Sequence, residues 1–80
     1  MNAAEAQEVK NLLLQNDDQY RHLAEQHLQL DHRLHELTEK HYLSTSEQLE
    51  EVTLKKRKLA LKDRMEEIAR EYAHAHSRAS

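Results

Sequence analysis

The stretch YLSTSEQ, residues 42–48, lies between two long runs of regularly spaced apolar residues. Ser44 and Glu47 have the spacing of a capping box, in which the hydroxyl and the carboxylate each satisfy a backbone N–H group at the start of a helix. The chain is therefore expected to turn over residues 43–46 and to begin a helix near Thr45.

On both sides of this stretch, apolar residues recur in steps of three and four, the spacing of a narrow helical seam. In an antiparallel hairpin whose opposed residues sum to 88, Leu34 faces Leu54 and Leu23 faces Met65. Half of 88 is 44, the position of the cap residue, so two independent signals agree. The alternative is one uninterrupted helix in a parallel coiled coil. The predicted hairpin core consists of Tyr20, Leu23, His27, Leu30, Leu34, Leu37, Leu54, Leu61, Met65, Ile68 and Tyr72.

A second break is expected in QNDDQ, residues 15–19, because Asn16, Asp17 and Asp18 are natural N-cap residues. The apolar ladder keeps its register across this segment, as a continuous helix would. The sequence thus predicts an all-α fold in one domain, residues 1–80, formed by a coiled-coil-like two-helix hairpin with a short N-terminal helical arm. The expected segments are an arm over 3–15, helix A over 18–42, a turn over 43–46, helix B over 45–75 and a frayed tail over 76–80.

The composition narrows the class of protein. The 80 residues include no Gly, Pro, Cys, Trp or Phe, and 34% are charged, which excludes a disulfide framework and a cysteine-based zinc site. The longest apolar run is Leu12–Leu14 and the acidic start lacks the features of a secretory signal, so we expect no membrane association and a cytoplasmic location. A chain this short buries little apolar surface alone. A homo-oligomer is therefore expected, in the first place a dimer.

Helix B carries a second apolar stripe. Leu49, Val52 and Leu59 lie more than about 100° around the helix from the seam residues at 100° per residue. Lys56 and Asp63 extend this stripe, and two antiparallel copies of helix B would bring Lys56 of one chain to Asp63 of the other. The plainer interpretation leaves these apolar residues scattered on the surface. The interface candidates are thus Leu49, Val52, Lys56, Leu59 and Asp63.

The segment LKKRKLALKD, residues 54–63, raises the possibility of nucleic-acid binding. Lys55, Lys58 and Lys62 occupy neighbouring positions on helix B, but no aromatic residue accompanies them for base stacking. Solvated or interface-flanking lysines are the preferred interpretation, with a nucleic-acid-associated protein as the alternative function. Lys58 also falls within the seam close to Asp31, and we expect these two residues to form a contact that fixes the helix register.

Seven histidines invite a metal hypothesis. His27, Asp31 and His35 are spaced i, i+4, i+8, but the outer two are about 12 Å apart along a helix, too far for one ion without other ligands. The preferred interpretation places His27 in the seam and predicts no cofactor. No nucleophile elbow, Gly-rich phosphate loop or concave core is indicated, so the protein is expected not to be an enzyme.

Two elements of the sequence resemble the YdcH-like family of small bacterial proteins. These are EQHLQLD on the first helix, and YLSTSEQLEE followed by LKKRKLALKDRMEEI on the second. The resemblance runs from about Leu12 to Arg70; Tyr20 stands where the family usually has Phe. It implies a helical hairpin and a bacterial origin, without catalytic or cofactor residues. The expected function is a non-catalytic interaction or structural module with an unidentified protein partner. The matching positions are His27, Asp31, Leu54, Lys55, Lys56, Lys58, Leu59, Leu61, Lys62 and Asp63.

Overall fold

The computed structural model describes residues 3–76, and within that range the regular structure is entirely α-helical, which confirms the predicted class. The helices are α1 (Ala3–Asn16), α2 (Asp18–Thr38) and α3 (Thr45–His76). The expected frayed tail over 76–80 begins at the last residue of α3 and otherwise lies outside the described residues. No helix within the described range is long and apolar enough to cross a membrane.

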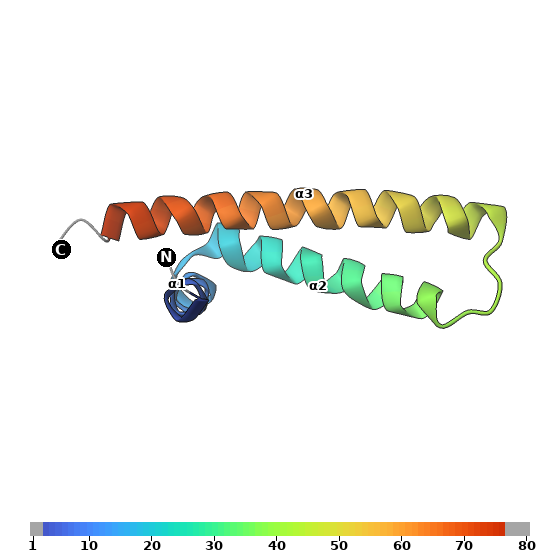
Figure 1. Ribbon diagram of the computed structural model, residues 1–80, viewed down its shortest axis with the longest axis horizontal. Helices are drawn as coiled ribbons and strands as arrows, with labels where there is room; N and C mark the ends of the chain where they lie inside the picture. Colours follow the sequence, from blue (N-terminus) through green and yellow to red (C-terminus); the bar gives the residue numbers. More distant parts are fainter. Residues whose placement is uncertain (1–2, 77–80) are drawn as a thin grey trace.

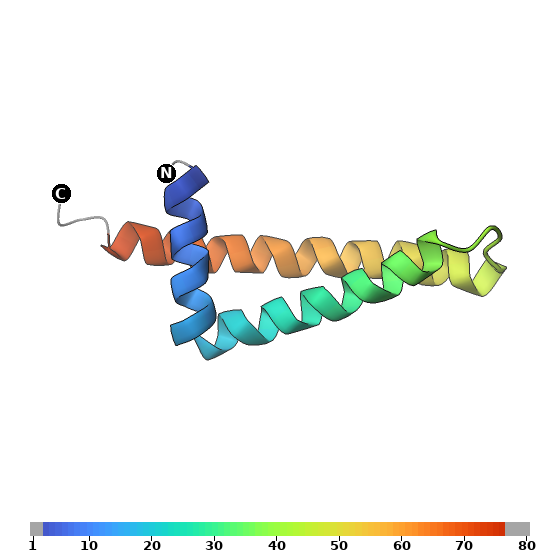
Figure 2. The same cartoon turned by 90° about the horizontal axis from the view of Figure 1, so that it is seen from below.

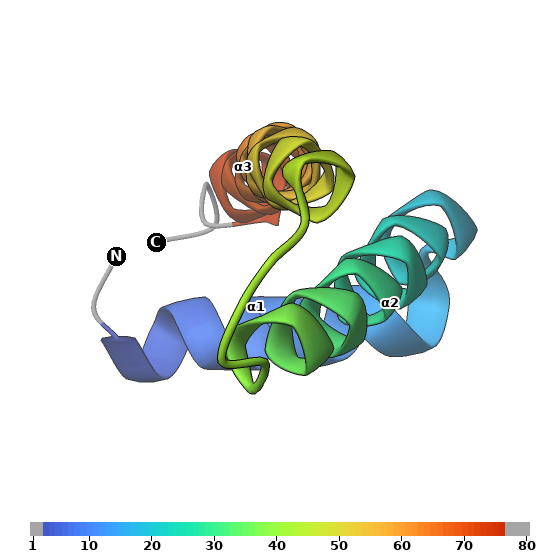
Figure 3. The ribbon, with the colours of Figure 1, turned by 90° about the vertical axis from the view of Figure 1, so that its right-hand side faces the viewer.

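The molecule is an elongated rod of 54 × 23 × 17 Å. α2 runs back along α3 in the opposite direction, and the connecting loop lies at the end of the rod away from α1 (Figure 1). α1 crosses α3, and its C-terminal end lies beside the start of α2 (Figures 2 and 3). This arrangement leaves one long side of α3 uncovered by the rest of the chain.

A single extended residue, Asp17, separates α1 from α2. Its backbone has φ −117° and ψ 111°, and its carboxylate accepts a hydrogen bond of 2.8 Å from the N–H of Tyr20. An N-cap residue with this geometry satisfies one of the otherwise unpaired donors at a helix start. The cap therefore starts α2 in a new direction, although the apolar spacing continues from α1 across the break.

The start of α3 is fixed by the predicted capping box, which the structure confirms. The N–H of Ser44 donates to Oε1 of Glu47 at 3.0 Å, and the N–H of Glu47 donates to Oγ of Ser44 at 3.1 Å. Each side chain satisfies a backbone donor of the other residue. The chain thus enters α3 with a defined direction.

The prediction that helix A reaches residue 42 is wrong, because α2 ends at Thr38. Leu37 is the last residue of α2 that is buried against α3, and the N–H of Lys40 then donates to the Leu37 carbonyl at 3.2 Å in a tightened final turn. The connection, residues 39–44, is longer than the turn predicted over 43–46. The chain has to cross the 8–10 Å between packed helix axes, and the longer connection does so while returning Leu43 to the apolar cluster around Leu37.

The buried side chains form two separate clusters, one at each end of the hairpin. The arm-end cluster joins all three helices and contains Leu13, Tyr20, Ile68 and Ala69. The turn-end cluster joins α2 and α3 and contains Leu34, Leu37 and Leu54. Between them the contact surface is only partly covered, as expected for two helices without a third layer along their full length.

Candidate functional site

The exposed apolar residues of α3 form the most prominent uncovered surface. Leu49, Val52 and Leu59 are 63%, 52% and 60% exposed, and Lys56 and Asp63 are exposed beside them. At 100° per residue these positions lie about half a turn around α3 from the buried Leu54. We call Leu49, Val52, Lys56, Leu59 and Asp63 the outer stripe, because its positions lie on the opposite side of α3 from Leu54; Leu59, at its margin, also lines the groove between α2 and α3.

The charged members of the outer stripe have no ion-pair partner in the part of the chain that the structure describes. Among residues 3–76, neither Lys56 nor Asp63 takes part in an ion pair. Most other charged residues near the hairpin contact do have such partners. The stripe therefore combines uncovered leucine and valine side chains with one unpaired charge of each sign.

The residues predicted for the hairpin core lie on the contacting faces of α2 and α3, with different degrees of burial. Tyr20, Leu34, Leu37, Leu54 and Ile68 are buried. The partly buried members are Leu23, His27, Leu30, Leu61, Met65 and Tyr72.

Sequence reasoning missed four residues of the apolar clusters. Leu13 and Ala69 are buried in the arm-end cluster, Val9 packs on that cluster, and Leu43 packs on the turn-end cluster. Leu13 belongs to the same apolar ladder as Tyr20, so its spacing contained the signal. For Leu43 no such signal exists, because its contact depends on the path of the loop.

Asp31 and Lys58 form an ion pair between α2 and α3. The hydrogen bond from Lys58 lowers the pKa of Asp31 below its ordinary value, and the nearby His27 and His32 act in the same direction. Both side chains are more than a third exposed, so the pair adds little net stability. Its physical effect is on register, since a slip of α2 along α3 would separate the two charges.

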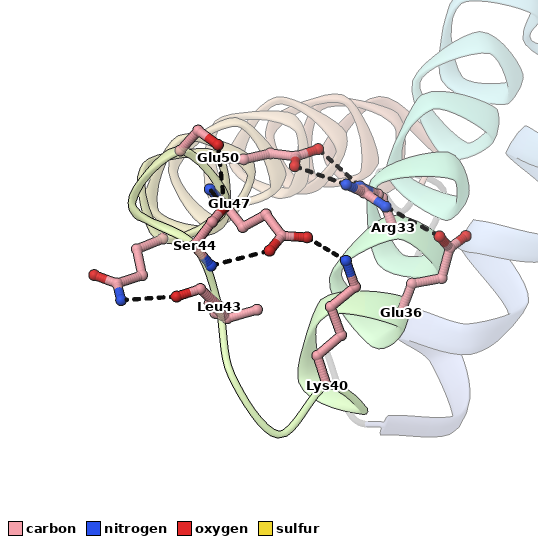
Figure 4. A network of polar contacts seen from close by, with 9 residues as sticks. Arg33, Glu36, Lys40, Leu43, Ser44, Glu47 and Glu50 are labelled. Carbon is pink, nitrogen blue, oxygen red and sulfur yellow. Dashed lines mark hydrogen bonds and ion pairs between the residues drawn. The ribbon is translucent and has the colours of Figure 1, made fainter.

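A second interhelical contact, absent from the sequence-based expectations, joins Arg33 of α2 to Glu50 of α3 (Figure 4). The Nε and Nη2 atoms of Arg33 donate to the two carboxylate oxygens at 2.8 and 2.9 Å, and Nη1 donates to Glu36 at 3.1 Å. This two-point contact raises the pKa of Arg33 and lowers that of Glu50. Planar, bidentate pairs of this kind fix orientation as well as distance.

At the turn, Glu47 connects the capping box to the first part of the loop after α2. Its carboxylate pairs with Lys40 and also accepts the Ser44 N–H (Figure 4). The hydrogen bond from Lys40, followed by that from Ser44, lowers the pKa of Glu47 from 4.5 to about 2. One side chain thus joins both ends of the loop to the start of α3.

Acidification should therefore destabilise the turn end of the hairpin. The folded pKa of Glu47 lies below the unfolded value of 4.5, so its contribution is complete above about pH 4.5 and is lost as the pH falls through about 2. The lowered pKa values of Asp31 and Glu50 act in the same direction. Thermal unfolding followed by circular dichroism should show a Tm that falls between pH 5 and pH 2, less steeply in Glu47→Gln.

The matched control for this experiment is Glu25→Gln, since Glu25 is exposed on α2 and forms no ion pair within the described residues. It should follow the wild-type pH profile. If the Tm of Glu47→Gln fell with decreasing pH as steeply as that of the wild type, this would contradict the role assigned to the Lys40–Glu47–Ser44 contacts.

The histidines considered as metal ligands do not come together in a metal site within the described residues. Asp31 is paired with Lys58, and Nε2 of His35 lies 2.9 Å from Oε1 of Glu39. His27 is partly buried in a hollow where the three helices meet. In the described part of the chain, no group of three or more His, Cys, Asp or Glu residues is placed to hold a metal ion.

The lysines of the alternative function are brought together by the fold. Lys55, Lys58 and Lys62 all line one open groove between α2 and α3, which also contains the exposed Leu28. Leu28 was not among the predicted site residues. Its position off the seam gave no signal, because a single exposed leucine is common on protein surfaces.

Comparison with models of protein families gives a match to a family of unknown function. The model of a family described as "Protein of unknown function (DUF465)" matches residues 21–69, which cover most of α2, the loop and most of α3. No curated protein and no solved structure matches the chain.

Proposed function

The chain belongs to the DUF465 family, and from that premise we propose that it is a non-catalytic helical interaction or structural module that self-associates through α3. In this proposal the folded unit of each copy is the two-helix hairpin with its N-terminal arm. We further propose that it is a YdcH-like member of the family, of bacterial origin and cytoplasmic.

The observation that carries the proposal is the outer stripe. Three large aliphatic side chains of α3 are more than half exposed. Small domains bury too little apolar surface to be stable by a wide margin. Covering this stripe with a second copy would remove apolar surface from water, at roughly 25 cal/mol per Å².

Charge placement favours an antiparallel arrangement of the two α3 helices. With the two-fold axis between Leu59 and Ala60, Lys56 of each copy lies level with Asp63 of the other. Both charges lack ion-pair partners in the described part of their own chain. Such pairs at the margin of an interface select the partner and its orientation more than they add affinity.

Reversing one of these charges should weaken self-association. Lys56→Glu would place two pairs of like charges across the proposed interface, and we expect the dimer dissociation constant to rise at least about tenfold, equivalent to about 1.4 kcal/mol. The double variant Lys56→Glu/Asp63→Lys restores opposite charges and should recover most of the affinity. Sedimentation equilibrium over a range of protein concentrations measures the dimer dissociation constants of both variants.

Arg57→Glu is the matched control, since it makes the same charge change on α3 beside the stripe instead of within it. It should leave the dimer dissociation constant within about twofold of wild type. A wild-type protein that stays monomeric at high concentration would contradict the proposal. A double variant that dimerises no more tightly than Lys56→Glu would also contradict it.

A further inference from the structure

A groove runs along one side of the hairpin, with α2 as one wall and α3 as the other; Figure 3 looks along these two helices. Its volume is about 930 Å³. Leu28 of α2 and Leu59 of α3 line it and are 56% and 60% exposed, so each wall presents an apolar side chain to solvent. The groove is thus a further uncovered surface; it involves both helices of the hairpin and shares Leu59 with the outer stripe.

The charge along this groove is unbalanced. Of its carboxylates, Asp31 is paired with Lys58 and Glu36 with Arg33. The other two lysines, at positions 55 and 62, are exposed: Lys55 makes only a 3.8 Å contact to Glu51, and Lys62 has no ion pair among residues 3–76.

Lys55 and Lys62 are seven residues apart on α3. This separation is about 10.5 Å, or two helical turns, at 1.5 Å per residue. The groove therefore presents two incompletely neutralised cations at a spacing that repeats along an α-helix.

We propose that this groove binds an acidic amphipathic helix of a protein partner. Two carboxylates seven residues apart on the incoming helix would pair with Lys55 and Lys62, and apolar side chains between them would contact Leu28 and Leu59. Along α2 the groove extends from Leu28 to Thr38, about 15 Å, which matches three turns of helix. Recognition would follow the helix-in-groove mode, with apolar anchors in a cleft between two helices.

Two other occupants fit the groove less well. A second copy of the chain placed symmetrically here would set lysines against lysines, and like charges across an interface are unfavourable. A nucleic acid would leave Leu28 and Leu59 without suitable contacts, and no aromatic side chain lines the groove for base stacking. The inference goes beyond self-association, since it assigns a partner of different chemistry to the groove, which shares only Leu59 with the outer stripe.

The test uses a fluorescent 18-residue Leu/Glu amphipathic peptide with glutamates at positions 4 and 11, titrated with the full-length protein by anisotropy. We expect saturable binding that weakens at least tenfold in Lys55→Glu/Lys62→Glu. Arg57→Glu/Arg70→Glu makes the same charge change on α3 outside the groove and should bind within about twofold of wild type. A peptide with lysines at positions 4 and 11 should recover binding to the Lys55→Glu/Lys62→Glu variant.

Two further measurements distinguish a helical protein partner from a nucleic acid. Leu28→Ser, which leaves every charge in place, should weaken peptide binding several-fold. A 20-nucleotide single strand and the corresponding duplex should bind more weakly than the peptide at the same salt concentration. The inference is overturned if nucleic acid binds more tightly through the same two lysines, if Leu28→Ser has no effect, or if both charge-reversal variants lose the peptide equally. Circular dichroism of each variant verifies that the hairpin is folded.

Discussion

Leu37→Ala should lower the free energy of unfolding by about 2–5 kcal/mol, the range observed for leucine truncation in protein cores. Leu37 is only 1% exposed, is the largest fully buried side chain described, and belongs to the turn-end cluster with Leu34 and Leu54. A protein of this size is stable by only about 4–12 kcal/mol, taking 0.05–0.15 kcal/mol per residue. The substitution would therefore remove a large share of the free energy of unfolding, and partial unfolding at 37 °C is expected.

Urea denaturation followed by circular dichroism at one fixed protein concentration measures this loss. The control is Leu28→Ala, the same truncation on the same helix at a position that is 56% exposed; it should change the free energy of unfolding by less than about 1 kcal/mol. Equal effects for the two variants would mean that Leu37 is not enclosed between α2 and α3.

Tyr20→Ala should have a comparable effect at the other end of the hairpin, about 3–5 kcal/mol by analogy with truncation of other large aromatic residues. Tyr20 is buried in the cluster that joins all three helices, with Leu13 of α1 and Ile68 of α3. Burial, followed by the charge of Glu66, raises the pKa of its hydroxyl, which is consistent with an enclosed ring. Removing the ring should loosen α1 from the hairpin before the hairpin itself unfolds.

Hydrogen exchange of the wild type and of Tyr20→Ala tests this order of events. Backbone amides of Ala3–Asn16 should lose protection in the variant while those around Leu34 and Leu54 retain it. Tyr42→Ala is the control, because Tyr42 is 90% exposed in the loop and makes little packing contact. Uniform loss of protection along the whole chain would indicate that α1 and the hairpin unfold as one unit.

Much of the local structure could be predicted because it depends on residues close together in the sequence. The all-α class follows from apolar spacing, and the start of α3 follows from the side-chain chemistry of Ser44 and Glu47. The end of α2 could not be predicted in this way. It depends on the distance the loop has to cross and on Leu43 returning to the core, and neither is encoded by residues 38–42.

The same distinction applies to the candidate surfaces. The outer stripe could be recognised because its residues belong to one helix and share one side of it. The Arg33–Glu50 contact and the groove beside Leu28 could not, because both depend on how far apart α2 and α3 lie and on their relative rotation. Features within one helix follow from its period, whereas features between helices require the packed structure.

Distances between spin labels in two copies of the chain test the α3 interface most directly. The chain contains no cysteine, so Ala60→Cys and Glu71→Cys each carry one label. With the two-fold axis between residues 59 and 60, the antiparallel dimer predicts a distance below about 25 Å for labels at 60, set by the 8–10 Å between packed axes and the label lengths. Labels at 71 should be separated by about 35 Å or more, from 1.5 Å per residue. Short distances at both positions would indicate a parallel dimer and contradict the account, as would the absence of any distance between copies.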